Sequence, residues 1–230
     1  MSLLAQPWVV KTRNRVRNSG LARALYSRWK ANFDYEERFG RALLESISPE
    51  SLVWDVGANV GLYTEQFLAK GAAQVICVEP APSAVEVLRA KFAAQQSRVV
   101  ILPMALSDAC GTAPMAADGA SPTNQLKVGA SDQRLIQVRI MRADELIRSQ
   151  GVPPPTVLKI DVEGYELEVL QGFGDLIESR ELRAVFIEVH FGLLHERTLD
   201  HAAEEISSIL TRSGFKVRWL DLSHISGIRP

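Results

Sequence analysis

Short apolar runs alternate with helix-forming stretches along most of the chain, and this alternation constrains the fold more than any other feature. The runs read SLVWDVGA, QVICVEP, VVILPMALS, LIQVRIM, TVLKIDVEG, RAVFIEVH and FKVRWLD. Helical spacing separates them at about 62–70, 83–94, 143–149, 165–178 and 201–213. A strand that is apolar throughout is buried on both faces, as in a parallel sheet covered by helices on either side. The sequence therefore predicts an α/β fold, Rossmann-like and doubly wound.

The charge distribution divides the chain into two parts. Residues 1–33 hold seven Lys or Arg and no acid, which leaves 26 − 7 = 19 basic against 27 acidic residues for the rest. A helical pattern runs from Leu21 to Ile47. We expect a basic helical extension over 1–50 and one domain over 51–230. The basic tail suits RNA, a membrane surface or an acidic partner, whereas Trp8, Trp29 and Phe33 favour packing on the body.

Composition excludes several classes of protein. With 47% hydrophobic and 23% charged residues the chain is an ordinary globular protein. No apolar run reaches the roughly 18 to 20 residues of a membrane span, and the apolar start precedes the basic residues, the reverse of a secretory signal. Cys77 and Cys110 have no zinc spacing around them. We therefore expect a cytoplasmic protein with no membrane span and no thiolate-bound metal, and a homo-oligomer is compatible with the sequence.

Ligands of doubly wound sheets bind beyond the carboxyl ends of the strands. The first strand ends in Asp55-Val56-Gly57-Ala58-Asn59-Val60-Gly61, a turn at which backbone can approach a nucleotide-like ligand. The second ends at Glu79-Pro80, 22 residues beyond Gly57, where an acid holds ribose hydroxyls. Asn59 replaces the second glycine of a dinucleotide fingerprint, and Asp55 suits a cationic amino-acid group. These residues predict S-adenosylmethionine as the cofactor.

Two further strand ends complete the candidate cofactor site. Met104 and Ala105 lie at the end of the third strand, where they would flank the adenine base. Asp161 directly follows a buried run, and acids are rarely buried without a partner or a task. We therefore assign Asp161 to the site in preference to a structural ion pair with Lys159. Glu166 and Glu168 are expected to be solvated residues of a helix start.

The fifth strand ends with Glu188 and His190, which point to one face because side chains of a strand alternate. Histidine titrates near neutral pH, so His190 is a candidate general base, with Asp161 as the alternative and Glu188 beside it. His195 is a weaker candidate. His201 and His224 are expected at the surface.

A magnesium ion on Asp161 is an alternative, because hard cations favour carboxylates. A second pair of acids at the fifth strand is absent, however, and Glu188 and His190 take its place. No metal is therefore expected. The glycine- and alanine-rich segment 111–133 suits a mobile lid whose Ser121, Asn124, Gln125 and Lys127 could read acceptor hydroxyls.

The motifs VWDVGANVGLYT, CVEP, ALSD, LKIDVEGYELEVLQG and FIEVH, in this order, resemble the FkbM family of S-adenosylmethionine-dependent methyltransferases over about 51–190. The resemblance implies a class I methyltransferase fold, with a seven-stranded sheet that ends in an antiparallel hairpin. It also implies methyl transfer to a hydroxyl, often of a sugar or secondary metabolite. By position, the turn residues Asp55, Gly57, Ala58, Asn59 and Gly61 would hold the methionine portion. Only nine residues, LSHISGIRP, follow FKVRWLD, so the last strand is expected to be short or cut off.

Three other functions remain open on the sequence alone. An RNA ribose 2′-O-methyltransferase would use the basic tail, although nucleic acid is not the expected partner. Methylation of a base nitrogen is disfavoured, because the fourth strand does not end in an N-P-P-[YF] tip. A non-catalytic cofactor-binding module and a nicotinamide-dependent oxidoreductase are the remaining rivals, and binding of S-adenosylmethionine against NAD separates them.

Overall fold

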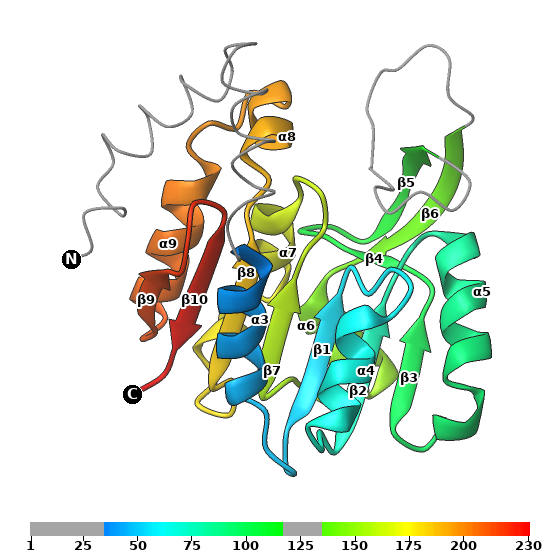
Figure 1. Ribbon diagram of the computed structural model, residues 1–230. Helices are drawn as coiled ribbons and strands as arrows, with labels where there is room; N and C mark the ends of the chain where they lie inside the picture. The colour runs from blue at the N-terminus through cyan, green and yellow to red at the C-terminus, as the bar shows by residue number, and fades with distance from the viewer. Residues whose placement is uncertain (1–34, 117–134) are drawn as a thin grey trace.

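A computed structural model describes residues 35–116 and 135–230, and its centre is a seven-stranded sheet (Figure 1). The strand order is β3-β2-β1-β7-β8-β10-β9. Its members are β1 (Leu52–Val56), β2 (Gln74–Val78), β3 (Val99–Leu102), β7 (Val157–Ile160), β8 (Ala184–Glu188), β9 (Lys216–Trp219) and β10 (His224–Ile228). The strands pair in parallel except β10, which is antiparallel to β8 and to β9. The predicted doubly wound α/β fold is confirmed.

Helices connect the strands and cover both faces of the sheet (Figure 1). They are α3 (Tyr35–Glu45), α4 (Leu62–Ala69), α5 (Pro82–Lys91), α6 (Ala143–Gln150), α7 (Glu166–Gly172), α8 (Phe191–Glu196) and α9 (Ala202–Arg212), with short 3-10 helices at η2 (Ala93–Gln95) and η3 (Gly174–Glu178). The predicted helix over 165–178 is thus two elements, α7 and η3. Pro82 begins α5, where its missing N–H costs nothing.

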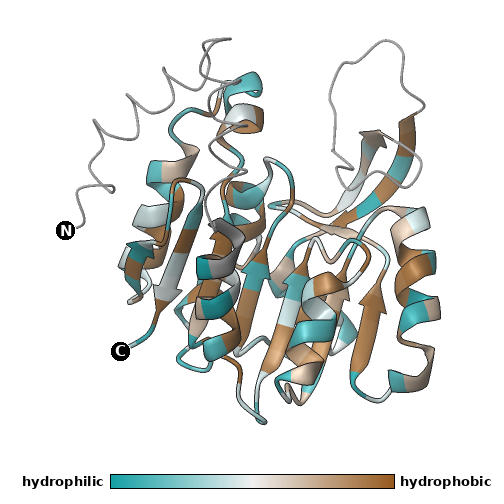
Figure 2. Ribbon diagram, viewed as in Figure 1, coloured by the Kyte–Doolittle hydropathy of each residue, from teal (hydrophilic) through white to brown (hydrophobic). Residues whose placement is uncertain are grey.

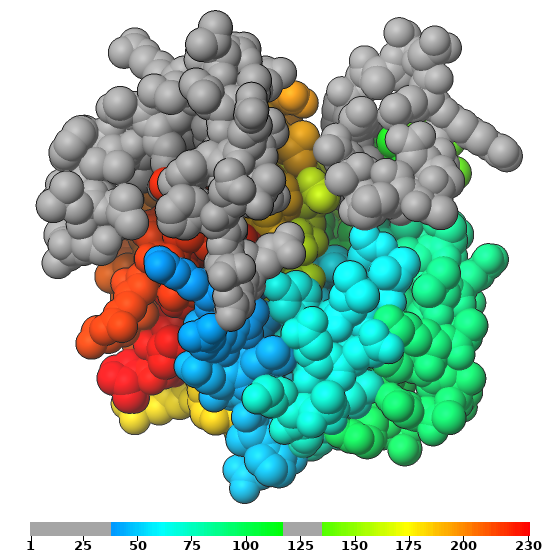
Figure 3. All heavy atoms as spheres, viewed as in Figure 1, coloured from blue at the N-terminus to red at the C-terminus, as the bar shows by residue number. Residues whose placement is uncertain are grey.

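The strands divide the core into two layers, because alternate side chains point to opposite faces. Val53 of β1 packs in one cluster with Phe39 of α3 and Phe67 of α4, whereas its neighbour Trp54 packs in the other, with residues of α6, α7 and α9. The brown strands of Figure 2 lie between these helices. Figure 3 shows α3, α4 and α5 side by side on one face.

Helix α3 lies inside the range assigned to the N-terminal extension, but its apolar side belongs to the core. Phe39 and Leu43 are buried, and the Phe39 ring meets Phe186 of β8 edge-on at 5.9 Å. The division of the chain at residues 50 and 51 stays a prediction. The basic stretch 1–33 with its tryptophans lies outside the described residues.

A second, smaller sheet lies beside the carboxyl ends of the main sheet (Figure 1). It contains β4 (Ala105–Leu106), β5 (Gly111–Ala116) and β6 (Leu135–Met141), with β6 in the middle. The predicted third strand is therefore divided into β3 and β4. The expectation of a loop from residue 111 is wrong for 111–116, which pair with β6 in an antiparallel ladder. The proposed acceptor-reading residues Ser121, Asn124, Gln125 and Lys127 lie outside the described residues.

The short C-terminal segment completes the antiparallel hairpin that the resemblance implies. β10 has five residues and lies between β8 and β9, so it is an interior strand of the sheet. His224, expected at the surface, is buried for this reason. Arg229 holds the end of the hairpin by donating to the backbone carbonyls of Ile177, Leu182 and Ser213.

Within 35–116 and 135–230, no helix has the length and apolar character that a membrane crossing requires.

Candidate functional site

The turn after β1 brings backbone close to the neighbouring strand ends. Gly57, Asn59 and Gly61 all have positive φ, and Asn59 is a residue type that tolerates this conformation. A Cβ on Gly57 would lie 1.8 Å from the carbonyl oxygen of Asp161, so no larger residue fits. The glycine therefore allows the turn to lie directly against the end of β7.

Glu79, at the end of β2, is tied to the same turn. Its Oε2 accepts a hydrogen bond from the backbone N–H of Asn59 at 2.8 Å, and its Oε1 accepts one from Ala81 at 2.9 Å. Burial raises the pKa of Glu79, while these backbone donors oppose the shift. Each carboxylate oxygen keeps acceptor capacity for a ligand hydroxyl.

A pocket lies over these strand ends. The predicted site residues that line it are Gly57, Asn59, Glu79, Pro80, Ala105 and Asp161. The other lining residues, which the sequence did not single out, are Val56, Val78, Leu106, Met115, Val162, Glu163 and Tyr165. Six of the predicted site residues, Asp55, Ala58, Gly61, Met104, Glu188 and His190, are not part of this lining.

Asp55 lies beneath the pocket in a buried polar cluster. Its Oδ1 pairs with the Lys159 ammonium at 3.0 Å, and its Oδ2 accepts a hydrogen bond from the Thr64 hydroxyl at 2.7 Å. Lys159 also donates to the carbonyl oxygen of Gly57 at 3.1 Å. Burial opposes the charged form of Lys159, but Asp55 and Asp161 outweigh it and raise its pKa above the ordinary range. This cluster supports the glycine turn from below.

Asp161 lies between Lys159 and His190, and both roles considered for it, a site role and an ion pair with Lys159, apply. Its Oδ2 lies 3.4 Å from the Lys159 ammonium, and its Oδ1 lies 3.7 Å from Nε2 of His190. The side chain keeps 28% of its surface exposed and lines the pocket. Asp161 therefore combines an ion pair with a position at the site.

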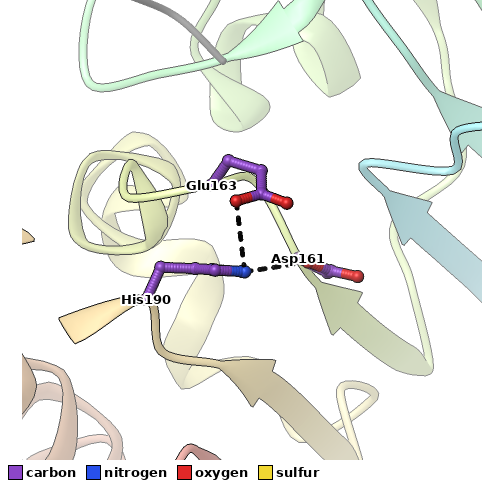
Figure 4. A group of neighbouring side chains, drawn as sticks. All are labelled: Asp161, Glu163 and His190. Carbon is purple, nitrogen blue, oxygen red and sulfur yellow. Dashed lines mark ion pairs between the residues drawn. The ribbon is translucent and has the colours of Figure 1, made fainter. Parts of the chain in front are cut away.

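His190 lies among four carboxylates, of which Figure 4 shows those of Asp161 and Glu163. Its Nδ1 donates to Oε1 of Glu166 at 2.7 Å. Its Nε2 faces Glu163 at 3.4 Å and Glu188 at 3.9 Å, besides Asp161. Burial alone would lower the pKa of His190, but the hydrogen bond and charge of Glu166, with the charges of Glu163 and Asp161, raise it to about 10.

The expectation that Glu166 is solvated is wrong. This residue is fully buried, and its Oε1 accepts from both His190 and the backbone N–H of Gly164. Its position at the start of α7 places the side chain under the loop 161–165 instead of in water. Glu168 likewise has limited exposure, because Arg197 pairs with it and stacks on Tyr165.

The remaining histidines differ in their surroundings. His224 is buried, with Nδ1 2.8 Å from Oδ2 of Asp221 and Nε2 3.5 Å from Oε2 of Glu188. His195 is half exposed and pairs with Asp200, while His201 is exposed and pairs with Glu205. His224 is thus the histidine that sequence reasoning misplaced. The strand that holds His224 is short, and its polar residues His224 and Ser226 point to the same face, so the sequence pattern did not indicate burial.

Most of the chain matches the model of a known protein family. The model of the methyltransferase FkbM domain matches residues 55–217. The hexuronic acid methyltransferase AglP of Haloferax volcanii is 33% identical over 158 residues, which are 66% of this chain and 62% of that protein. The 31-O-demethyl-FK506 methyltransferase FkbM of Streptomyces tacrolimicus is 28% identical over 223 residues, 82% of this chain and 83% of that protein.

The chain covers different shares of its relatives. It spans less than two thirds of AglP, and only 10% of the antimetabolite synthetase AmbE of Pseudomonas aeruginosa, to which it is 26% identical. Among solved structures, a protein of Streptococcus mutans described as a methyltransferase in complex with SAH has a TM-score of 0.51 at 13% identity. That match covers 84% of this chain and 97% of the other, and it supports the fold.

Proposed function

The chain belongs to the FkbM methyltransferase family, and from this premise we propose that it transfers a methyl group from S-adenosylmethionine to a hydroxyl oxygen. The proposed acceptor is a sugar, a glycoside or another secondary metabolite. The observation that carries the proposal is the shared pocket at the ends of β1, β2 and β7, where Glu79 and Asp161 line the same cavity. One acid lies where ribose hydroxyls are expected and the other where a reacting group is expected.

The pocket lining suits the three chemical parts of this cofactor. Glu79 offers carboxylate acceptors for hydroxyl groups. Pro80, Ala105 and Leu106 present apolar surface of the kind that packs on a flat base. Asp161 supplies negative charge, which complements a cationic sulfur. Asp55 lies below this lining, so we propose that it acts on the cofactor through the turn that Lys159 supports.

When bound, S-adenosylmethionine supplies a methyl group on a positively charged sulfur. The chain must then hold the acceptor oxygen in line with that methyl group and remove its proton. Correct positioning is worth up to about 7 to 11 kcal/mol, and a general base adds about 10²- to 10⁴-fold. Asp161 lines the pocket and is placed to accept the proton, whereas His190 lies behind it and fixes the neighbouring carboxylates. Glu188, the third predicted catalytic residue, lies 3.9 Å from Nε2 of His190 and is not part of the pocket lining.

The relatives support oxygen acceptors on small molecules. AglP is named for a hexuronic acid and the Streptomyces protein for 31-O-demethyl-FK506. Because the chain spans 62% of AglP, its own acceptor is proposed only as a class. We propose no nucleic acid as the acceptor.

Two measurements test this function. Calorimetry with S-adenosylmethionine and with NAD should give binding of the first alone. A transfer assay with labelled S-adenosylmethionine should then label members of a panel of sugars, glycosides, macrolides and hydroxylated lipids. Asp161→Asn should lower turnover at least about 100-fold, since it removes the proton acceptor. The exposed Asp200→Asn is the matched control and should keep wild-type turnover.

Each contrary outcome has a distinct meaning. Preferential binding of NAD would replace the proposal with an oxidoreductase. Binding of S-adenosylmethionine with no labelled product from any acceptor would favour a non-catalytic module. Labelling of RNA at ribose, but of no small molecule, would move the acceptor to nucleic acid. Full turnover in Asp161→Asn would remove Asp161 as the base and return that role to His190.

A further inference from the structure

The loop after β7 and the end of β8 place three different ligand groups around one point. One atom each from Asp161, Glu163 and His190 lies within 4.8 Å of the others (Figure 4). The Nε2 atom of His190 is 3.4 Å from Oε2 of Glu163 and 3.7 Å from Oδ1 of Asp161. Ligands of a tetrahedral cation at about 2.1 Å lie about 3.4 Å from one another. The two distances from His190 are therefore close to those between ligands of one cation.

A residue outside this trio fixes the direction of the histidine. The carboxylate of Glu166 is fully buried and holds Nδ1 of His190 at 2.7 Å. Nδ1 therefore carries the proton, and Nε2 is directed between the two carboxylates. A buried carboxylate on the far nitrogen is the arrangement that orients metal-binding histidines.

The other ring nitrogen of His190, Nε2, makes no hydrogen bond within the residues that the structure describes. Its distances to the carboxylates are longer than the roughly 2.7 to 3.2 Å of such bonds. Glu188, at 3.9 Å, adds a further negative charge. This ring nitrogen is therefore aimed at two carboxylates and is hydrogen-bonded to neither, so the three groups face one point.

We propose that Asp161, Glu163 and His190 bind one divalent transition-metal cation, with Glu166 as the residue that orients His190. Imidazole together with carboxylates suits Zn²⁺ or Mn²⁺, whereas Mg²⁺ prefers oxygen ligands and retains its waters. The sequence led us to expect no metal, because Glu188 and His190 take the place of a second pair of acids at the fifth strand, and Glu163 was not among the predicted site residues. Two of the ligands, Asp161 and Glu163, also line the pocket.

The site has a use in the reaction, and this part of the inference rests on the proposed function. A cation at this point would bind the acceptor oxygen as a further ligand and make its proton easier to remove. The proton would still pass to Asp161, since the cation takes one of its carboxylate oxygens and leaves the other as an acceptor. Vicinal hydroxyls of a sugar could supply two oxygens, so polyols would bind better than isolated alcohols.

The test measures metal binding directly, without methyl transfer. The full chain, free of any histidine tag and treated with a chelator, is titrated with ZnCl₂, MnCl₂ or MgCl₂ in a calorimeter. We expect one Zn²⁺ or Mn²⁺ per chain and much weaker Mg²⁺ binding. Glu163→Gln, which keeps the size of the side chain, should weaken Zn²⁺ binding at least about 10-fold. Co²⁺ in the same site should give visible absorption bands that Glu163→Gln weakens.

A surface pair of the same chemistry provides the control. The side chains of His201 and Glu205 are exposed and lie 3.6 Å apart at the start of α9, and His201→Gln should leave metal binding unchanged. Equal Zn²⁺ affinity in wild type and Glu163→Gln, or no binding of Zn²⁺ and Mn²⁺ up to about 1 mM, would overturn the site. Calorimetry with S-adenosylmethionine in EDTA separates the two proposals. Cofactor binding without metal binding rejects the site alone, and the reverse result rejects the proposed function alone.

Discussion

Gly57 is the residue at which the geometry of the site is most sensitive to a single side chain. Its φ is +77°, and an added Cβ would lie 1.8 Å from the Asp161 carbonyl oxygen, a backbone atom that cannot swing aside. Gly57→Ala should therefore destabilise the chain by several kcal/mol or prevent folding, because the turn must separate from β7. Urea unfolding followed by circular dichroism measures the loss.

Gly71 provides a control that measures the cost of a positive φ in the absence of a clash. It has φ +93°, and a Cβ there would meet no atom within 4 Å. Gly71→Ala should cost only about 1 kcal/mol, from strain alone. Similar losses for the two variants would show that contact with Asp161 does not limit position 57.

Site residues at strand ends could be predicted from the sequence, whereas the buried residue that contacts His190 could not. Asp161 and Glu79 stood out because each follows a buried strand, and position relative to a strand end can be inferred from periodicity. Glu166 could not be placed in this way. A glutamate in the first turn of a helix is usually solvated, and its burial depends on the path of the loop 161–165 and on His190.

Neighbouring strands β1 and β7 are joined by an ion pair inside the sheet. Asp55 of β1 and Lys159 of β7 are paired in the register, and both side chains are almost fully buried. Lys159→Met should destabilise the chain by about 3 to 5 kcal/mol, because it leaves the Asp55 carboxylate buried without its partner. Thermal and urea unfolding provide the measurement.

The double variant tests the reason for that loss. Asp55→Asn combined with Lys159→Met removes both charges, so it should be more stable than Lys159→Met alone. Thr64 can still hydrogen-bond to the asparagine oxygen that replaces its carboxylate partner. A double variant as unstable as the sum of the two single variants would mean that the charges do not interact.

The elements themselves could be predicted where apolar runs were long and uniform. The strands of the main sheet other than β10 lie within predicted runs, since burial leaves a clear apolar pattern. β5 was missed because GTAPMA contains residues with low strand propensity, and it pairs only because β6 supplies the ladder. Strand pairing of this kind depends on tertiary context that local sequence does not contain.

For the whole molecule, the C-terminal hairpin links the sheet, α3 and the site. His224 of β10 stacks on Phe39 of α3, with ring centroids 4.3 Å apart, and lies between Asp221 and Glu188. Glu188 in turn faces His190. The family resemblance implied the hairpin, but the sequence indicated neither the burial of His224 nor this connection.

The buried His224 should make global stability depend on pH. Burial would lower its pKa, but hydrogen bonds to Asp221 and Glu188 outweigh this effect and raise the pKa from 6.5 to about 9. Because the folded chain binds this proton more tightly than the unfolded chain, the stabilisation is complete below about pH 6.5 and is lost as the pH rises through about 9. The difference in unfolding free energy between wild type and His224→Gln should therefore shrink by up to about 3 kcal/mol between about pH 6 and pH 9.5.

Urea unfolding between about pH 6 and pH 9.5 measures this difference in free energy. The variant His201→Gln, at an exposed position, is the control and should show no such trend. A difference for His224→Gln that stays constant with pH would mean that folding does not change the pKa of His224, and that packing on Phe39 accounts for its contribution.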